Sequence, residues 1–97
     1  MTEKIISFDI AQHLETDADI QEFLNETVQQ GGASDFIHAL GIAARAKGMS
    51  EVAKQAGVTR ASLYKSLADG GNPEFETVFR VCNALGVRLV ALPVQTV

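Results

Sequence analysis

Residues 50–67, Ser-Glu-Val-Ala-Lys-Gln-Ala-Gly-Val-Thr-Arg-Ala-Ser-Leu-Tyr-Lys-Ser-Leu, have the pattern of two short helices joined by a tight turn. Ser50 is expected to cap the first helix and Gly57 to end it, because the residue after a helix usually needs a positive φ. Thr59 is expected to cap the second helix. This spacing predicts a helix-turn-helix, a unit that lays its second helix in the DNA major groove. The alternative is an ordinary helical hairpin.

The second helix of this motif has an inner face and an outer face. Leu63 and Leu67, four residues apart, are predicted to point into the core. On the outer face, Arg60 is suited to read guanine or hold a phosphate, and Lys65, like Lys54, is suited to a phosphate contact. The residues predicted to contact DNA are Ser50, Lys54, Thr59, Arg60, Ala61, Ser62, Tyr64 and Lys65.

The charge of the chain is distributed unevenly. Its net charge of −4 argues against a nucleic-acid partner, but residues 1–35 hold eight acidic side chains against one lysine, a net charge of −7. Residues 36–68 hold five basic side chains against Glu51, a net charge of +4. The positive third coincides with the helix-turn-helix, which is the electrostatic pattern that a DNA-binding module needs.

The remaining sequence predicts a mostly all-α fold of five or six helices with one C-terminal β-strand. Apolar spacing and breakers predict further helices over residues 10–14, 18–30, 35–47 and 74–85, with Asp17 as the cap of the second. The length predicts a single domain, residues 1–97. Within it we distinguish an acidic helical segment (1–33), a helix-turn-helix core (34–86) and the strand (87–92).

The strand needs a partner, because an isolated strand leaves its backbone groups unpaired. It can pair with residues 4–8 or with the same strand of a second copy, and the second arrangement is favoured because a two-fold dimer presents two recognition helices. The residues predicted at this dimer interface are Val87, Leu89, Val90 and Leu92.

Catalysis, metal binding and membrane insertion find little support in the sequence. His13 and His38 fall on different predicted helices, and no ligands with metal-binding spacing surround them. Cys82 lies on an apolar helix face and is expected to be a core residue. No apolar run is long enough to span a membrane, and the N-terminus lacks the pattern of a signal peptide. We therefore expect a cytoplasmic protein that is not an enzyme and needs no cofactor or metal.

The motif, the loop after it and the end of the chain together resemble a known family. The residues that carry the resemblance are Ala43, Arg45, Lys47-Gly48-Met49, Ala53-Lys54, Gly57-Val58, Arg60, Leu63-Tyr64-Lys65, Leu67, Gly71-Asn72-Pro73, Phe75, Val78, Ala84-Leu85-Gly86-Val87, and, nearer the N-terminus, Phe8-Asp9, Asp19-Ile20 and Leu24-Asn25-Glu26. The chain resembles addiction-module antidotes, antitoxins with a repressor-like helix-turn-helix. The resemblance implies a dimer that binds DNA, represses its own operon and neutralises a toxin, typically a small basic RelE-like ribonuclease. It also shows a departure: many repressor-like domains have Gln where this chain has Glu51, whose carboxylate would repel phosphate.

The acidic N-terminal segment has two interpretations. It is either a solvated helix face or a surface complementary to a basic toxin. The residues predicted to bind toxin are Asp17, Asp19, Glu22 and Glu26. Two alternatives to an antitoxin stay open: a helix-turn-helix regulator without a toxin, and a protein-interaction domain whose DNA-binding motif is vestigial.

Overall fold

A computed structural model describes residues 10–94 of the chain. Residues 10–13 form a helical turn, followed by α2 (Asp17–Gln30), α3 (Ala33–Lys47), α4 (Met49–Ala56), α5 (Arg60–Leu67) and α6 (Phe75–Ala84). The prediction of a mostly helical fold is confirmed. The possible strand at residues 4–8 lies outside the described residues.

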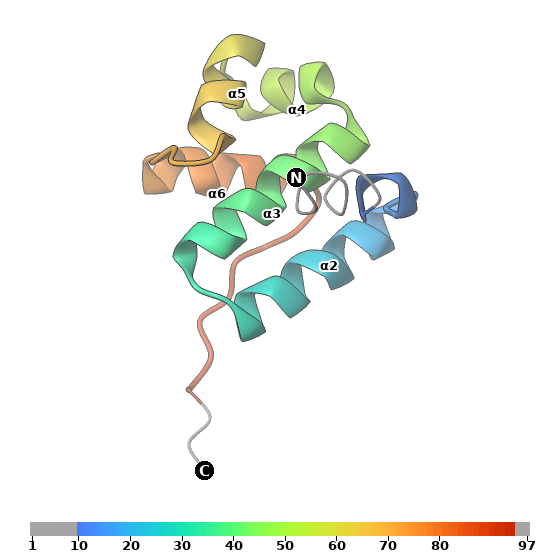
Figure 1. Cartoon of the computed structure of the whole chain (residues 1–97), viewed down its shortest axis with the longest axis vertical. Coiled ribbons are helices and arrows are strands. Elements are labelled where there is room, and N and C mark those ends of the chain that lie inside the picture. Colours follow the sequence, from blue (N-terminus) through green and yellow to red (C-terminus); the bar gives the residue numbers. More distant parts are fainter. Residues whose placement is uncertain (1–9, 95–97) are drawn as a thin grey trace.

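Helix α3 occupies the middle of the molecule (Figure 1). It packs against α2 on one side and against α4, α5 and α6 on the other. Its central residues, from Ala39 to Ala44, are all buried. One of them, Gly41, lets the backbone of α5 approach, since a Cβ there would lie 3.2 Å from the carbonyl oxygen of Leu67. The small side chains of α3 therefore let four other helices surround it.

The core consists of apolar side chains from every labelled helix. Leu40, Val52, Leu63, Val81 and Leu85 are completely excluded from solvent. The sequence predicted an inner face of Leu63 and Leu67 for α5, and both are buried as expected. Among the described residues no buried side-chain nitrogen or oxygen lacks a hydrogen-bond partner. The core is thus held by apolar burial, which is the main favourable term in folding.

Gly71 lies in the loop between α5 and α6, close under the end of α5. Its N–H donates to the carbonyl oxygen of Ala68 at 2.8 Å. A Cβ at this position would overlap the carbonyl oxygen of Ser66 and lie 2.9 Å from those of Ala68 and Lys65. The loop can turn back on α5 this closely only because residue 71 has no side chain.

The predicted C-terminal strand is wrong for the residues that the structure describes. Gly86, with φ +82°, follows the end of α6, and residues 87–94 are then neither helix nor strand. A strand needs a hydrogen-bonded neighbour, and residues 10–94 contain no other strand to provide one. Val87 and Leu89 instead pack their side chains against the core. Residues 87–94 therefore form an extended tail that runs beside α2 (Figure 1).

Candidate nucleic-acid interface

The turn between α4 and α5 fixes the geometry of the predicted DNA-binding motif. Gly57 ends α4 in the left-handed region, at φ 74° and ψ 30°, as the sequence predicted. The N–H of Val58 donates to the carbonyl oxygen of Ala53 at 3.0 Å, which satisfies one of the free carbonyls at the end of α4. Val58 also packs against the core. The two helices are therefore held together by backbone hydrogen bonds and by an apolar anchor in the turn.

The caps of the two helices were predicted with mixed success. Thr59 caps α5 as expected, because its hydroxyl oxygen accepts a hydrogen bond from the N–H of Ser62 at 3.0 Å. The expectation that Ser50 caps α4 is wrong: α4 begins one residue earlier, at Met49, and its cap is Gly48 with φ 119°. Ser50 consequently lies exposed in the first turn of α4, where its hydroxyl is free of a capping role.

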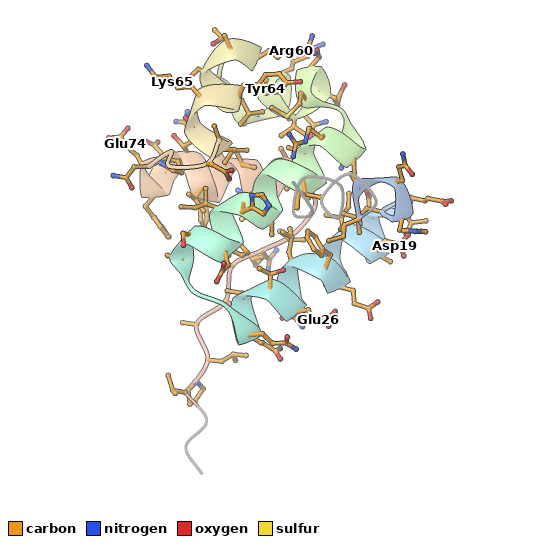
Figure 2. The ribbon with its side chains drawn as sticks, in the orientation of Figure 1. Asp19, Glu26, Arg60, Tyr64, Lys65 and Glu74 are labelled. Carbon is orange, nitrogen blue, oxygen red and sulfur yellow. The ribbon has the colours of Figure 1, made fainter. Side chains whose placement is uncertain are left out.

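Helix α5 presents its predicted contact residues to solvent. Arg60, Ala61, Ser62, Tyr64 and Lys65 are all exposed, and the labelled side chains Arg60, Tyr64 and Lys65 project from the same end of the molecule in Figure 2. The helix is therefore anchored by its leucines and its other side faces solvent, which is the arrangement that the predicted recognition helix requires.

Arg60 and Tyr64 form a pair that the sequence reasoning missed. The guanidinium carbon of Arg60 lies 5.5 Å from the centre of the Tyr64 ring, and Arg60 Nη2 donates to the Tyr64 hydroxyl oxygen at 3.4 Å. The spacing of four residues on a helix was the available signal. Since Tyr64 is 42% exposed, it is not a core residue. The guanidinium therefore lies against the ring on the exposed side of α5.

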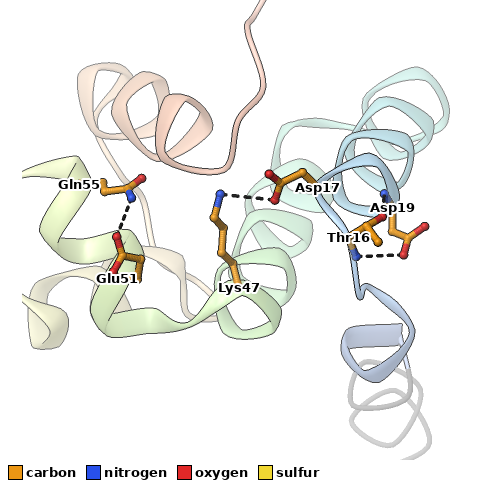
Figure 3. A network of polar contacts seen from close by, with 6 residues as sticks. All are labelled: Thr16, Asp17, Asp19, Lys47, Glu51 and Gln55. Carbon is orange, nitrogen blue, oxygen red and sulfur yellow. Dashed lines mark hydrogen bonds and ion pairs between the residues drawn. The ribbon is translucent and has the colours of Figure 1, made fainter.

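Helix α4 brings a cation and an anion to the same region. Lys54 and Glu51 are both exposed. The Glu51 carboxylate accepts a hydrogen bond from the side-chain amide of Gln55 at 2.6 Å (Figure 3). This bond leaves the negative charge in place at the first turn of α4, where a phosphate would otherwise approach the N–H groups of the helix. Glu51 is therefore an exposed carboxylate at the position where many repressor-like domains have Gln.

The start of α2 is organised differently from the expectation. Thr16, and not Asp17, caps the helix. The Asp19 carboxylate accepts hydrogen bonds at 3.1 Å from the backbone N–H groups of Thr16 (Figure 3) and of Glu15. These bonds stabilise the ionised carboxylate, and the bond from Thr16 has the larger effect. They hold the pKa of Asp19 below its usual value of 3.8. Asp17 lies 3.5 Å from the ammonium group of Lys47 on α3. Both residues thus have structural partners within the chain.

The four predicted toxin-binding residues consequently divide into two groups. Asp17 and Asp19 lie in the first turn of α2, where they have the structural partners just described. Glu22 and Glu26 lie one helical turn apart further along the helix and are exposed, without such a structural role. Figure 2 shows Asp19 and Glu26 far from Arg60 and Lys65 along the 42 Å long axis of the molecule. The acidic surface and the α5 surface are therefore separate.

The predicted dimer-interface residues also divide. Val87 and Leu89 pack inward, while Val90 and Leu92 are 67% and 78% exposed. Together with α2, the tail borders a groove of about 600 Å³ whose lining includes Leu24, Val28 and Phe36. Only the outer side chains of the tail are open to a second chain.

Cys82 and the two histidines are the remaining candidate groups. Cys82 is buried, and burial raises the pKa of its thiol to about 11, so it is a core residue as predicted. His38 on α3 lies 3.3 Å from Asp69, and His13 belongs to a different helix. Across residues 10–94 no three His, Cys, Asp or Glu side chains gather as metal ligands, and no helix there is both long and apolar enough to cross a membrane.

Comparison with known proteins agrees with the family that the motif residues resemble. The family described as "Probable addiction module antidote protein" matches residues 4–93. A protein of Haemophilus influenzae, itself described as uncharacterized, is 44% identical over 88 residues, which cover 91% of each chain. No solved structure matches the chain significantly.

Proposed function

This chain belongs to the family of probable addiction module antidote proteins, and from that membership we propose that it is a type II antitoxin that represses its own operon. In this proposal the chain binds operator DNA as a homodimer through α5 and neutralises a small basic toxin of the RelE-like kind in the cytoplasm. The word antidote itself implies a toxin partner. An antidote of this kind is generally not an enzyme.

The exposed side of α5 carries the DNA-binding part of the proposal. A capped helix, anchored by Leu63 and Leu67, presents Arg60, pre-oriented by Tyr64, and Lys65 to solvent. Arg60 has the geometry to bind a guanine edge through two hydrogen bonds. Lys65 and Lys54 supply the phosphate contacts that hold the helix in register. Four small residues lie at helix starts and allow the backbone to approach the DNA: Ser50, Thr59, Ala61 and Ser62.

The acidic surface of α2 carries the toxin-binding part. Glu22 and Glu26 present two uncompensated carboxylates one turn apart, and Asp17 and Asp19 add to the negative field from the end of the helix. Such a field accelerates the encounter with a basic protein. Because this surface and α5 lie at different ends of the molecule, the two ligands do not compete for the same residues.

The DNA-binding proposal is tested with three variants on DNA from upstream of the gene. Arg60→Ala should weaken specific binding by ~1–3 kcal/mol. Lys65→Ala should weaken binding to all sequences alike and lower the salt slope by about one. Arg88→Ala, which removes an exposed positive charge from the tail, is the matched control and should bind as the wild type does. Unchanged gel-shift titrations for both Arg60→Ala and Lys65→Ala would refute α5 as the reading helix.

The antitoxin proposal is tested on the gene beside this one. If that gene encodes a small basic protein that arrests growth, coexpression of this chain should restore growth and the two proteins should copurify. If no neighbouring product is toxic while DNA binding persists, the chain is a regulator without a toxin. If DNA binding also fails, the interaction domain with a vestigial motif is correct, an outcome that the exposed carboxylate of Glu51 favours.

A further inference from the structure

Helix α6 has a second apolar surface that the rest of the described chain leaves uncovered. Val81, Cys82 and Leu85 are buried on its inner side. On its outer side, Phe75 is 72% exposed and Phe79 is 43% exposed, with their ring centres 6.2 Å apart. Single exposed apolar residues are ordinary, but two aromatic rings in contact form a patch that favours burial against another surface.

A charged pair lies beside the two rings. Arg80 Nη2 lies 2.8 Å from Glu76 Oε2, and both side chains are largely exposed. The pair Glu76 and Arg80 is centred on position 78 of the helix, and the pair Phe75 and Phe79 on position 77. The two pairs therefore share almost the same midpoint along α6.

This arrangement is self-complementary. A two-fold axis perpendicular to α6 near positions 77–78 reverses the direction of a second copy of the helix. It places Phe75 against Phe79 of the second copy, and Glu76 against its Arg80, with each contact repeated by symmetry. A basic toxin offers no such match, since the pair of Glu76 and Arg80 has no net charge to attract it.

We propose that the outer side of α6, formed by Phe75, Glu76, Phe79 and Arg80, is the surface through which two copies of this chain associate in antiparallel orientation. The inference specifies the homodimer on which the proposed function rests. It replaces the tail as the main interface, because Val87 and Leu89 are already packed against their own core.

The size of the surface sets the strength of the dimer. Ten helical residues span only about 15 Å, and one side of such a helix buries less than the roughly 800 Å² per partner of a standard interface. The dimer is therefore weak and depends on concentration. Two copies on adjacent operator half-sites then bind together more tightly than either alone. The surface contains none of the residues proposed for DNA or toxin contact.

A charge-exchange experiment tests the register directly. Sedimentation velocity on the full chain, from micromolar to several hundred micromolar, should show the wild type passing from monomer to dimer. Glu76→Arg and Arg80→Glu each place like charges opposite one another in the dimer, so each should weaken self-association at least ~10-fold. An equimolar mixture of the two variants restores opposite charges at both contacts and should form a heterodimer.

Two further variants complete the test. Phe75→Ser/Phe79→Ser should stay monomeric with a melting temperature close to that of the wild type, because both rings are exposed. Val90→Pro removes a donor from the tail and should still dimerise. The proposal is overturned if the wild type is monomeric throughout, if either charge variant dimerises normally, if the mixture fails to associate, or if only Val90→Pro becomes monomeric.

These outcomes are separable from failure of the proposed function. A wild-type chain that shifts operator DNA or neutralises its toxin while staying monomeric overturns the α6 interface alone. A dimer that follows the charge rule but neither binds DNA nor rescues growth overturns the proposed function alone.

Discussion

Replacing Gly71 with alanine should destabilise the fold by about 2–3 kcal/mol, the upper part of the range for overpacking. The added methyl group would meet the carbonyl oxygens of Ser66, Ala68 and Lys65. These are backbone atoms at the end of α5, so no side chain can rotate away and the loop itself must move. For a domain of this size the expected loss corresponds to a fall in Tm of roughly 10–20 °C.

Circular dichroism during thermal and urea denaturation measures this effect. The matched control is Gly32→Ala, since a Cβ at Gly32 meets no atom within 4 Å and the φ there is −97°. Alanine is a poorer helix cap than glycine but lowers the entropy of the unfolded chain, so the control should change stability by less than about 1 kcal/mol. A Gly71→Ala variant that melts with the control would refute the close approach of the loop to α5.

Three further predictions concern α2 and the core. Replacing Glu22 and Glu26 with lysine should slow toxin association at low salt much more than it speeds dissociation, as measured by surface plasmon resonance. If the variant and the wild type associate at equal rates, the acidic surface of α2 is a solvated helix face that does not bind toxin. The pKa of Asp19 is lower in the folded chain than in the unfolded chain. The ionised carboxylate therefore raises the free energy of unfolding above pH 3.8, and this contribution is lost as the pH falls through the pKa of the folded chain. Asp19→Ala should therefore lower Tm at pH 7, with a difference from the wild type that shrinks towards pH 3; a difference independent of pH would contradict the capping role. Cys82, whose raised pKa keeps the thiol protonated, should react with a disulfide reagent at neutral pH only as fast as the fold opens, and a rate like that of a free thiol would show that the site is accessible.

The features predicted correctly are those that neighbouring residues determine. Gly57 and Thr59 act within one turn of themselves, through a left-handed φ and a hydroxyl that reaches the third residue of the helix. The error at Asp17 was also local: Thr16 and Asp19 have the spacing of a capping box, and this signal was present in the sequence.

The features predicted wrongly depend on distant parts of the fold. Val87 to Leu92 have the composition of a strand, but composition cannot provide the neighbour that a strand needs. The helix predicted over residues 74–85 likewise has many apolar residues, yet the core covers only part of them and leaves Phe75 and Phe79 exposed. Apolar spacing identifies a helix, but which of its apolar residues are buried depends on what packs against it.

The central position of α3 limits how events at the two ends of the molecule can influence each other. Helix α2 packs on α3, which in turn packs on α4 and α5, and Lys47 at the end of α3 holds Asp17 of α2. If the proposed function is correct, a toxin bound on α2 would have to change operator affinity through α3, which lies between the two surfaces. Thermodynamic linkage then requires operator DNA to change toxin affinity by the same factor. Lys47→Met would remove one link between α2 and α3. Because it also frees Asp17 of the proposed toxin surface, toxin affinity without DNA is measured first and the coupling is taken as the change that DNA adds.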